Sequence, residues 1–169
     1  EKHNLTLIEG YGTTETSPVI TANRLDDNRM GSIGKPITKV QVRIVSLETG
    51  KEIDAGQEGK ILVKGPNVMK GYFGDEAGTA EKIVDGWYDT GDIGVIDTDG
   101  YLWHRGRSKR FVKIGGEMVS LVKTELALEE VLPEGVACCV VDVPDERKGS
   151  RLAVALSQAI DDKDIIQKL

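Results

Sequence analysis

Short apolar runs separated by glycine-containing turns constrain the fold of this chain more than any other feature. In residues 39–45 every second side chain is apolar (Val40, Val42 and Ile44), which is typical of a half-buried strand. Turns around Gly50 and Gly100 lie between such runs and predict two hairpins. We therefore expect the first hundred residues to be mostly antiparallel β-structure.

The same patterns predict the other elements of this part. Residues 5–8 are predicted as a short strand, and residues 60–64 as a strand that Gly65 and Pro66 end. Residues 77–84 are a candidate helix. Strands at 93–96 and 101–104 flank the second turn.

The pattern changes near residues 106–109, where we place a domain boundary. Three further strands are predicted at 110–114, 136–143 and 152–159, and a helix at 120–132 with Ser120 as its N-cap. The fold class is therefore α+β, with a β-rich domain at 1–108 and a small α+β domain at 109–169. A last helix is predicted to begin at Asp161 or Asp162, and both ends resemble those of a fragment.

Composition excludes several classes of protein. The net charge of −6 without a block of like charges argues against a nucleic-acid binder and a polybasic membrane anchor. No apolar run approaches the roughly 20 residues that cross a bilayer, and no secretory leader is visible. Cys138 and Cys139 are adjacent in a predicted strand, so we expect reduced, small core residues in a cytoplasmic protein.

Residues 9–18, Glu-Gly-Tyr-Gly-Thr-Thr-Glu-Thr-Ser-Pro, follow the first predicted strand. The glycines around Tyr11 let the backbone pass close to a planar ligand on which the ring stacks. The hydroxyls of Thr13 and Thr14 suit a phosphate, and the Glu15 carboxylate suits Mg²⁺. A turn with a helix cap at Thr13 or Thr14 explains the same residues equally well.

Two later segments carry polar groups of the same kind. Residues 86–92 end in Thr-Gly-Asp, and the Asp92 carboxylate at the end of a tight turn suits two ribose hydroxyls. Such a sequence is more often a simple turn. Arg107, Lys109 and Arg110 lie beside the predicted boundary, where a solvated loop is the ordinary explanation and a phosphorylated sugar the functional one.

Other residues have simpler explanations. His104 is a strand histidine more readily than a catalytic one, and Trp87 and Trp103 are packing residues. The acidic loop at 142–146 has no metal-ligand spacing.

The order and spacing of residues 11–15, 88–92 and 106–116 resemble the adenylate-forming superfamily of acyl-CoA synthetases, luciferases and peptide-synthetase adenylation domains. Residues 31–36 and 63–72 fit too, so the resemblance covers nearly the whole chain. It implies the C-terminal, β-rich part of a large nucleotide-binding domain and the start of a small mobile domain. Such enzymes make an acyl-adenylate and pyrophosphate from a carboxylate and ATP, and a thiol then displaces AMP.

The resemblance also implies a role for each matching residue in the first motif. Tyr11 corresponds to the aromatic that stacks on adenine, and Gly12 and Thr13 belong to the same cofactor site. Thr14 corresponds to the hydroxyl on the α-phosphate, with a catalytic role. Glu15 corresponds to the carboxylate associated with Mg²⁺.

The later motifs complete that site by resemblance. Asp92 matches the aspartate that holds the ribose hydroxyls, and Arg107 the arginine beside it. Lys109 falls at the hinge about which the small domain turns between the two half-reactions. Gly116 matches the glycine beside which the phosphopantetheine arm enters.

The segment 109–121 is similar to the acyl-carrier-protein synthetase portion of bacterial 2-acylglycerophosphoethanolamine acyltransferase. The commoner pattern has a proline and a glutamate near Leu121 and Lys123, and an acidic residue in place of Arg110. These departures favour a fatty acid and acyl-carrier protein, in phospholipid metabolism, over CoA. The parent is expected in the cytoplasm, either free or at the inner face of the plasma membrane.

Two parts of the superfamily's machinery have no counterpart in this sequence: the upstream phosphate loop, and the adenylating lysine near the C-terminus. Neither Lys163 nor Lys168 has a matching context, so we predict that the chain alone forms no adenylate. Two alternatives stay open: a fragment of a fatty acyl-CoA synthetase, and a noncatalytic nucleotide-binding or interaction module.

Overall fold

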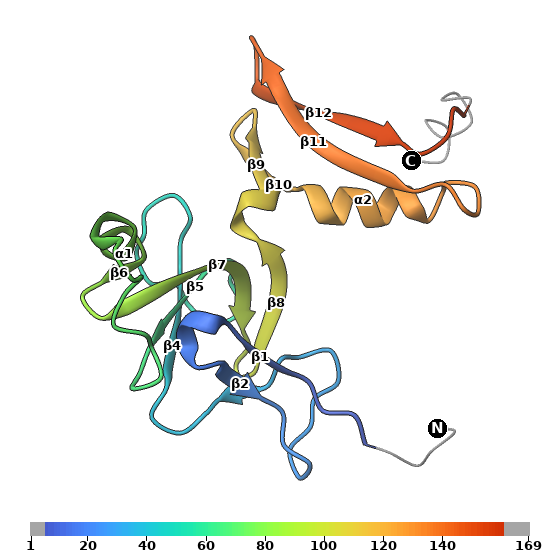
Figure 1. Cartoon of the computed structure of the whole chain (residues 1–169). Coiled ribbons are helices and arrows are strands. Elements are labelled where there is room, and N and C mark those ends of the chain that lie inside the picture. The colour runs from blue at the N-terminus through green and yellow to red at the C-terminus, as the bar shows by residue number, and fades with distance from the viewer. Residues whose placement is uncertain (1–5, 161–169) are drawn as a thin grey trace. The chain divides into compact units, whose positions relative to one another are not determined.

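The computed structural model describes residues 6–160, which fall into two compact units, Glu1–Ser108 and Lys109–Leu169 (Figure 1). The described part is β-rich and antiparallel with two α-helices, so the predicted α+β class is confirmed. Within this part no helix is long and apolar enough to cross a membrane.

The first unit contains two antiparallel sheets. Strands β1, β2 and β3 form one, and β4, β5, β7 and β6 lie side by side in the other, where β8 also pairs with β7. A single turn of 3₁₀-helix, η1 (Thr14–Thr16), follows β1, and α1 (Glu76–Lys82) precedes β6. The strand bounds are β1 Gly10–Gly12, β2 Val19–Ala22, β3 Lys35–Pro36, β4 Gln41–Val45, β5 Gly59–Lys64, β6 Ile83–Val84, β7 Trp87–Ile96 and β8 Leu102–Arg107.

Both predicted hairpins are present. The Ser46 N–H donates to the Lys51 carbonyl at 2.8 Å around Gly50, and the Asp97 N–H donates to the Tyr101 carbonyl at 3.0 Å around Gly100. Both glycines have positive φ, 66° and 84°, a conformation that costs glycine little. The turn chemistry therefore fixes where β4 and β7 end.

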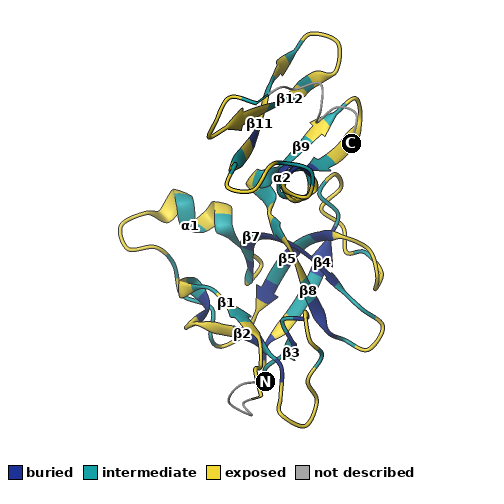
Figure 2. Ribbon diagram, turned by 90° about the vertical axis from the view of Figure 1, so that its right-hand side faces the viewer, coloured by how far each residue is buried: buried dark blue, intermediate teal, exposed yellow. Residues whose placement is uncertain are grey.

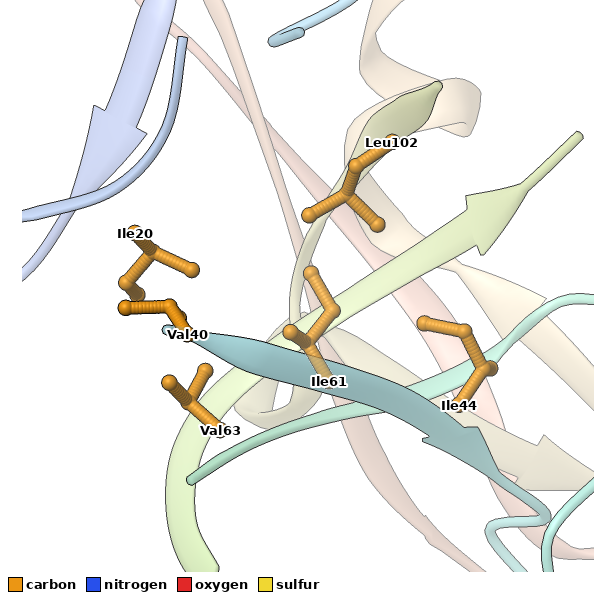
Figure 3. Packing of buried hydrophobic residues seen from close by; sticks show 6 residues of the cluster. All are labelled: Ile20, Val40, Ile44, Ile61, Val63 and Leu102. Carbon is orange, nitrogen blue, oxygen red and sulfur yellow. The ribbon is translucent and has the colours of Figure 1, made fainter. Parts of the chain in front are cut away.

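One apolar cluster joins the two sheets of the first unit. Its buried members come from β2, β4, β5 and β8 and from the residue preceding β4, and Figure 3 shows their side chains converging. Removing such side chains from water is the main favourable term for this unit. The cluster consists of Ile20, Val40, Ile44, Ile61, Val63 and Leu102.

Burial differs sharply between the elements of this unit. Buried residues gather on β5 and β7, whereas α1 contains none (Figure 2). The helix prediction for 77–84 was wrong at its end, because Ile83 pairs with Tyr88 of β7. The predicted strand at 5–8 was also wrong over 6–8, where Leu7 is 79% exposed and β1 begins only at Gly10.

The second unit starts with a tight hairpin. Strand β9 (Phe111–Ile114) pairs with β10 (Glu117–Ser120), and the two turn residues Gly115 and Gly116 have φ of 58° and 99°. Two positive φ values in succession match a type I′ turn. Strand β10 was not predicted, because Gly115 and Gly116 were expected only to end the strand at 110–114 and not to turn the chain into a second strand.

Helix α2 (Leu121–Glu129) follows β10 directly. Ser120 is its N-cap, as predicted, and its hydroxyl accepts from the Lys123 N–H at 3.2 Å. The helix ends three residues earlier than predicted. Leu121 and Leu128 pack with Val140 of β11 (Cys138–Asp145), which pairs with β12 (Gly149–Leu156).

The cysteines correct another prediction. Both are free, as expected, but Cys139 is exposed and Cys138 only half-buried, so Cys139 is not a core residue. Adjacent residues on β11 face opposite sides, and only one side packs on α2. The predicted helix at Asp161 or Asp162 lies outside the described residues.

Candidate nucleotide site

Three strands bring Tyr11, Asp92 and Arg107 together. Tyr11 lies on β1, Asp92 on β7 and Arg107 on β8, directly opposite Asp92 in the strand register. The Tyr11 hydroxyl donates to Asp92 Oδ2 at 2.5 Å, and Arg107 Nε lies 2.9 Å from Asp92 Oδ1. Predicted site residues from distant parts of the sequence thus meet at one carboxylate.

A bulge in β7 sets the direction of Asp92. The stretch from Asp89 to Ile93 faces only the stretch from Leu62 to Lys60 of β5, so β7 carries extra residues there. Gly91 has a φ of 75° inside this bulge. The prediction that Asp92 ends a tight turn was therefore wrong, because the turn lies earlier and Asp92 lies within the strand.

Hydrogen bonds of Thr90 hold this bulge in place. Its hydroxyl donates to the Ile61 carbonyl at 3.0 Å and accepts from the Asp92 N–H at 3.1 Å. Thr90 is buried, so both bonds are shielded from water. The middle residue of Thr-Gly-Asp is a glycine because the bulge needs a positive φ, and the threonine ties the bulge to β5.

The environment of Asp92 keeps it charged. Burial raises the pKa of its carboxyl, but the neighbouring His104 and Tyr11 side chains and the Arg107 charge outweigh burial and lower the pKa overall. Burial and the hydrogen bond to Asp92 raise the pKa of the Tyr11 hydroxyl far above its usual range. At neutral pH the pair is a carboxylate and a neutral phenol.

An open groove of about 370 Å³ is lined by Tyr11 and by other residues on and near the paired strands β1 and β2. Its walls are mostly apolar and include Ile8, Pro18 and Val19. A groove of this kind beside an aromatic ring suits a planar ligand. It is lined by Ile8, Glu9, Gly10, Tyr11, Gly12, Pro18, Val19, Thr21 and Ala22.

Gly12 and Thr13 have structural reasons of their own. A Cβ on Gly12 would lie 1.6 Å from the Pro18 carbonyl oxygen, so the close approach of β1 and β2 requires glycine. Thr13 caps η1, and its N–H donates to Thr16 Oγ1 at 3.1 Å. Thr14 is an exposed residue of η1. The predicted cap is therefore at Thr13, and Thr14 is left accessible to a ligand.

Glu15 is anchored on two sides. Its carbonyl accepts from the Met69 N–H at 2.8 Å, and its carboxylate accepts from the Tyr72 hydroxyl at 2.9 Å. Burial raises the pKa of this carboxyl, but hydrogen bonds from its own backbone and from Tyr72, Tyr88 and Thr13 lower it overall. One ionised carboxylate fits Mg²⁺ that is also held by phosphate oxygens. Residues 6–160 hold no cluster of three or more metal-ligating side chains.

Lys109 and Gly116 belong to the second unit. Lys109 is exposed on η2 (Ser108–Arg110), and Gly116 is the exposed second residue of the β9–β10 turn. Arg110 donates to the Glu125 carboxylate of α2 and, at 3.2 Å, to the Val140 carbonyl of β11. The role of Lys109 as the hinge residue and the place of Gly116 beside the phosphopantetheine arm stay predictions.

Sequence reasoning missed the place of His104. Its Nε2 lies 3.6 Å from Asp92 Oδ1, and its ring centroid lies 5.8 Å from that of Tyr11. Strict alternation puts residues 104 and 107 on opposite faces of β8. Gly106 pairs with Ile93 and His104 with Gly94, so Arg105 is an extra residue that returns His104 to the side of Arg107. No pattern in a single strand reveals this bulge.

The tryptophans pack as predicted, by cation–π contact and hydrogen bond. The Arg43 guanidinium lies 4.1 Å above the Trp87 ring, and Trp103 Nε1 donates to Asp97 at 2.9 Å. The prediction of an acidic loop at 142–146 was wrong over 142–145, because these residues form the end of β11 and pair with β12. The Asp145 carboxylate accepts from the backbone N–H groups of Arg147 and Lys148.

Known proteins resemble this chain over most of its length. It is 39% identical over 147 residues to a feruloyl-CoA synthase of an Amycolatopsis species, covering 86% of this chain and 30% of that protein. It is 40% identical over 146 residues to a long-chain-fatty-acid–CoA ligase of Bacillus subtilis strain 168, covering 85% and 26%. The chain thus spans about a third or less of these relatives.

Solved structures agree. The crystal structure of ATP-bound MatB from Rhodopseudomonas palustris superimposes with a TM-score of 0.82 at 34% identity, covering 96% of this chain and 33% of that one. Residues 1–73 match the model of the AMP-binding enzyme family. From the family match and these relatives together, we conclude that the chain belongs to the AMP-binding enzymes, the adenylate-forming superfamily.

Proposed function

We propose that the chain is part of an ATP-dependent acid–thiol ligase and that its first unit binds the nucleotide. The observation that carries this proposal is the buried Asp92 carboxylate held between Tyr11 and Arg107. In the proposed site Asp92 and Arg107 hold the ribose. Tyr11 borders adenine, together with the backbone of Gly12 and Thr13, because Tyr11 and Gly12 line the groove of about 370 Å³.

In the proposed site, residues of η1 contact the phosphate end of the nucleotide. The exposed hydroxyl of Thr14 donates to the α-phosphate, and the Glu15 carboxylate faces Mg²⁺. The bound metal supplies charge neutralisation for the phosphates. The Tyr72 hydrogen bond holds Glu15 ionised and oriented toward that task.

A calorimetric titration with AMP tests the nucleotide site. We expect the chain to bind AMP, and Asp92→Ala or Tyr11→Ala to weaken binding by about tenfold or more, because each removes a polar contact made in a buried place. Thr98→Ala, in an exposed hairpin turn, is the matched control. Equal binding by all four proteins would refute this site.

The chemistry of the whole enzyme follows its superfamily. A carboxylate oxygen attacks the α-phosphorus of ATP and releases pyrophosphate, and a thiol then attacks the acyl carbon and releases AMP. We propose that this chain alone does not catalyse the first step, because it contains neither a phosphate loop nor an adenylating lysine in a matching context. Pyrophosphate–ATP exchange by the isolated chain would refute that.

The acceptor is the finer part of the proposal. We propose a fatty acid as substrate and acyl-carrier protein as acceptor, with Gly116 beside the phosphopantetheine arm and Lys109 at the hinge. Support comes from Leu121, Lys123 and Arg110, which depart from the commoner CoA-ligase pattern. An enzyme of this kind serves phospholipid metabolism from the cytoplasm, free or at the inner membrane face.

CoA is the second candidate acceptor, and the relatives favour it. The similar proteins named above are a feruloyl-CoA synthase and a long-chain-fatty-acid–CoA ligase. Thioester formation by the longer parent enzyme, with acyl-carrier protein and CoA offered in parallel, separates the two. A chain that binds AMP while its parent forms no thioester with either acceptor would instead support the noncatalytic module.

A further inference from the structure

Accessible side chains cover Asp92, and one of them has no role in the site proposed so far. The Asp92 side chain is only 2% exposed, whereas that of His104 is 38% exposed and that of Arg107 is 68% exposed. The imidazole is therefore an accessible group within 3.6 Å of the buried carboxylate.

The two carboxylate oxygens differ in what they accept. Asp92 Oδ2 takes the hydrogen bond from Tyr11. Asp92 Oδ1 lies 2.9 Å from Arg107 Nε and 3.6 Å from His104 Nε2, yet it is buried and accepts no well-directed hydrogen bond from the described residues. An unsatisfied buried acceptor costs free energy. Oδ1 is therefore the oxygen with unused acceptor capacity, next to the exposed side chains of His104 and Arg107.

Packing fixes the imidazole beside this oxygen. The rings of His104 and Tyr11 are 5.8 Å apart and tilted by 40°, within the range of paired rings. The gap of 3.6 Å between His104 Nε2 and Asp92 Oδ1 is too long for a direct hydrogen bond. It is short enough for one hydroxyl oxygen to lie within hydrogen-bond distance of both atoms.

We propose that His104 takes part in recognising the sugar. Together with Asp92 Oδ1 it binds one ribose hydroxyl, so that the site selects ribonucleosides over their deoxy analogues. The proposal rests on the nucleotide site proposed above. The hydroxyl donates to Oδ1 and accepts from the Nε2–H of His104, which uses both its donor and its acceptor capacity.

Nucleosides without phosphate test this reading directly. Adenosine, 2′-deoxyadenosine and 3′-deoxyadenosine are titrated into the chain and into His104→Phe, which keeps a ring against Tyr11 and removes the N–H donor. We expect the native chain to prefer adenosine to one deoxynucleoside by about tenfold or more, because the missing hydroxyl makes two hydrogen bonds. In His104→Phe this preference falls by about fivefold, the value of one hydrogen bond, because the hydroxyl keeps its bond to Asp92 Oδ1. The affinity for that deoxynucleoside changes by less than about twofold.

His104→Gln is the second variant, because it retains an N–H donor and is expected to keep most of the preference. Equal weakening of all three nucleosides in His104→Phe, or an intact preference for adenosine, overturns the proposal. If Asp92→Asn abolishes binding while His104→Phe does not change it, the nucleotide site stands and only the role of His104 falls. If the native chain binds neither adenosine nor AMP, both fall.

Discussion

The hydroxyl of Tyr11 hydrogen-bonds to Asp92 and so links the two sheets of the first unit. Tyr11 lies in the three-stranded sheet and Asp92 in the five-stranded sheet, 81 positions later in the chain. Because the acceptor is an ionised, buried carboxylate, the bond is charge-assisted and stronger than a neutral one. The same contact therefore serves both the fold and the proposed site.

Tyr11→Phe is expected to destabilise the first unit by about 1.5–3 kcal/mol, since it removes this donor and leaves a buried oxygen unsatisfied. Urea unfolding followed by circular dichroism measures the change. Tyr72→Phe is the matched control, because its hydroxyl bonds Glu15 at an exposed position and should cost less than about 1 kcal/mol. Equal losses would contradict the special role of the Tyr11 bond.

Asp92 should make stability depend on pH. Its folded-state pKa is lowered, since His104, Tyr11 and Arg107 outweigh its burial. Its contribution is then complete above the unfolded-state pKa of about 3.9 and is lost as the pH falls through the folded-state pKa.

The measurement compares the native chain with Asp92→Asn between about pH 6 and pH 3. The difference in unfolding free energy should shrink as the pH falls. Asp26→Asn, in an exposed pair with Arg24, should show only a small difference throughout. A difference for Asp92→Asn that stays constant, or grows, at low pH contradicts the lowered pKa.

Two glycines of the site region should respond differently to alanine. Gly12→Ala places a Cβ 1.6 Å from the Pro18 carbonyl and should destabilise by more than about 3 kcal/mol or prevent folding. Gly91→Ala meets no atom within 4 Å and suffers only from its φ of 75°, at about 1 kcal/mol. Thermal unfolding ranks them, and the reverse ranking would refute the packing of β1 on β2.

Arg110 and Glu125 form a half-buried ion pair that ties the start of β9 to α2 and β11 in the second unit. Glu125 also accepts from the Val140 N–H at 2.8 Å, and the hydrogen bonds from Arg110 and Val140 lower the pKa of its carboxyl. Arg110→Ala and Glu125→Ala should each cost about 1–3 kcal/mol, and the double variant less than their sum. Lys109→Ala, at an exposed neighbour, should change stability by under about 0.5 kcal/mol. Strict additivity would show that the pair is not coupled.

Local patterns predict most of the fold, because most strands have one face toward a core and one toward solvent, which makes apolar and polar residues alternate. Alternation placed β4 and β5 to within two residues, and turn chemistry placed both hairpins. The errors occur where pairing with a distant strand or an unrecognised turn decides the structure. Ile83 was predicted to be helical but is not, because it pairs with β7. Strand β10 was not predicted, because it depends on a turn of two glycines.

The candidate site was harder to predict than the strands. No local pattern predicts the contact between Tyr11 and Asp92. The resemblance to a family implied only that both residues belong to the same nucleotide site. His104 was predicted to be an ordinary strand histidine, and strict alternation along the strand would place it on the opposite face from Arg107, because it does not include the extra residue at Arg105.

Because β7 and β8 each contain a bulge, the contacts among Tyr11, Asp92, His104 and Arg107 depend on the number of residues in these strands as much as on the residue types. Deletion of Gly91 or Arg105 would preserve every side chain of the cluster and most of both strands. It would nevertheless rotate Asp92 or His104 toward the opposite face of the sheet, because side chains alternate along a strand. A substitution therefore changes one side chain of the group formed by Tyr11, Asp92, His104 and Arg107, whereas a change in the length of either segment separates the members of that group.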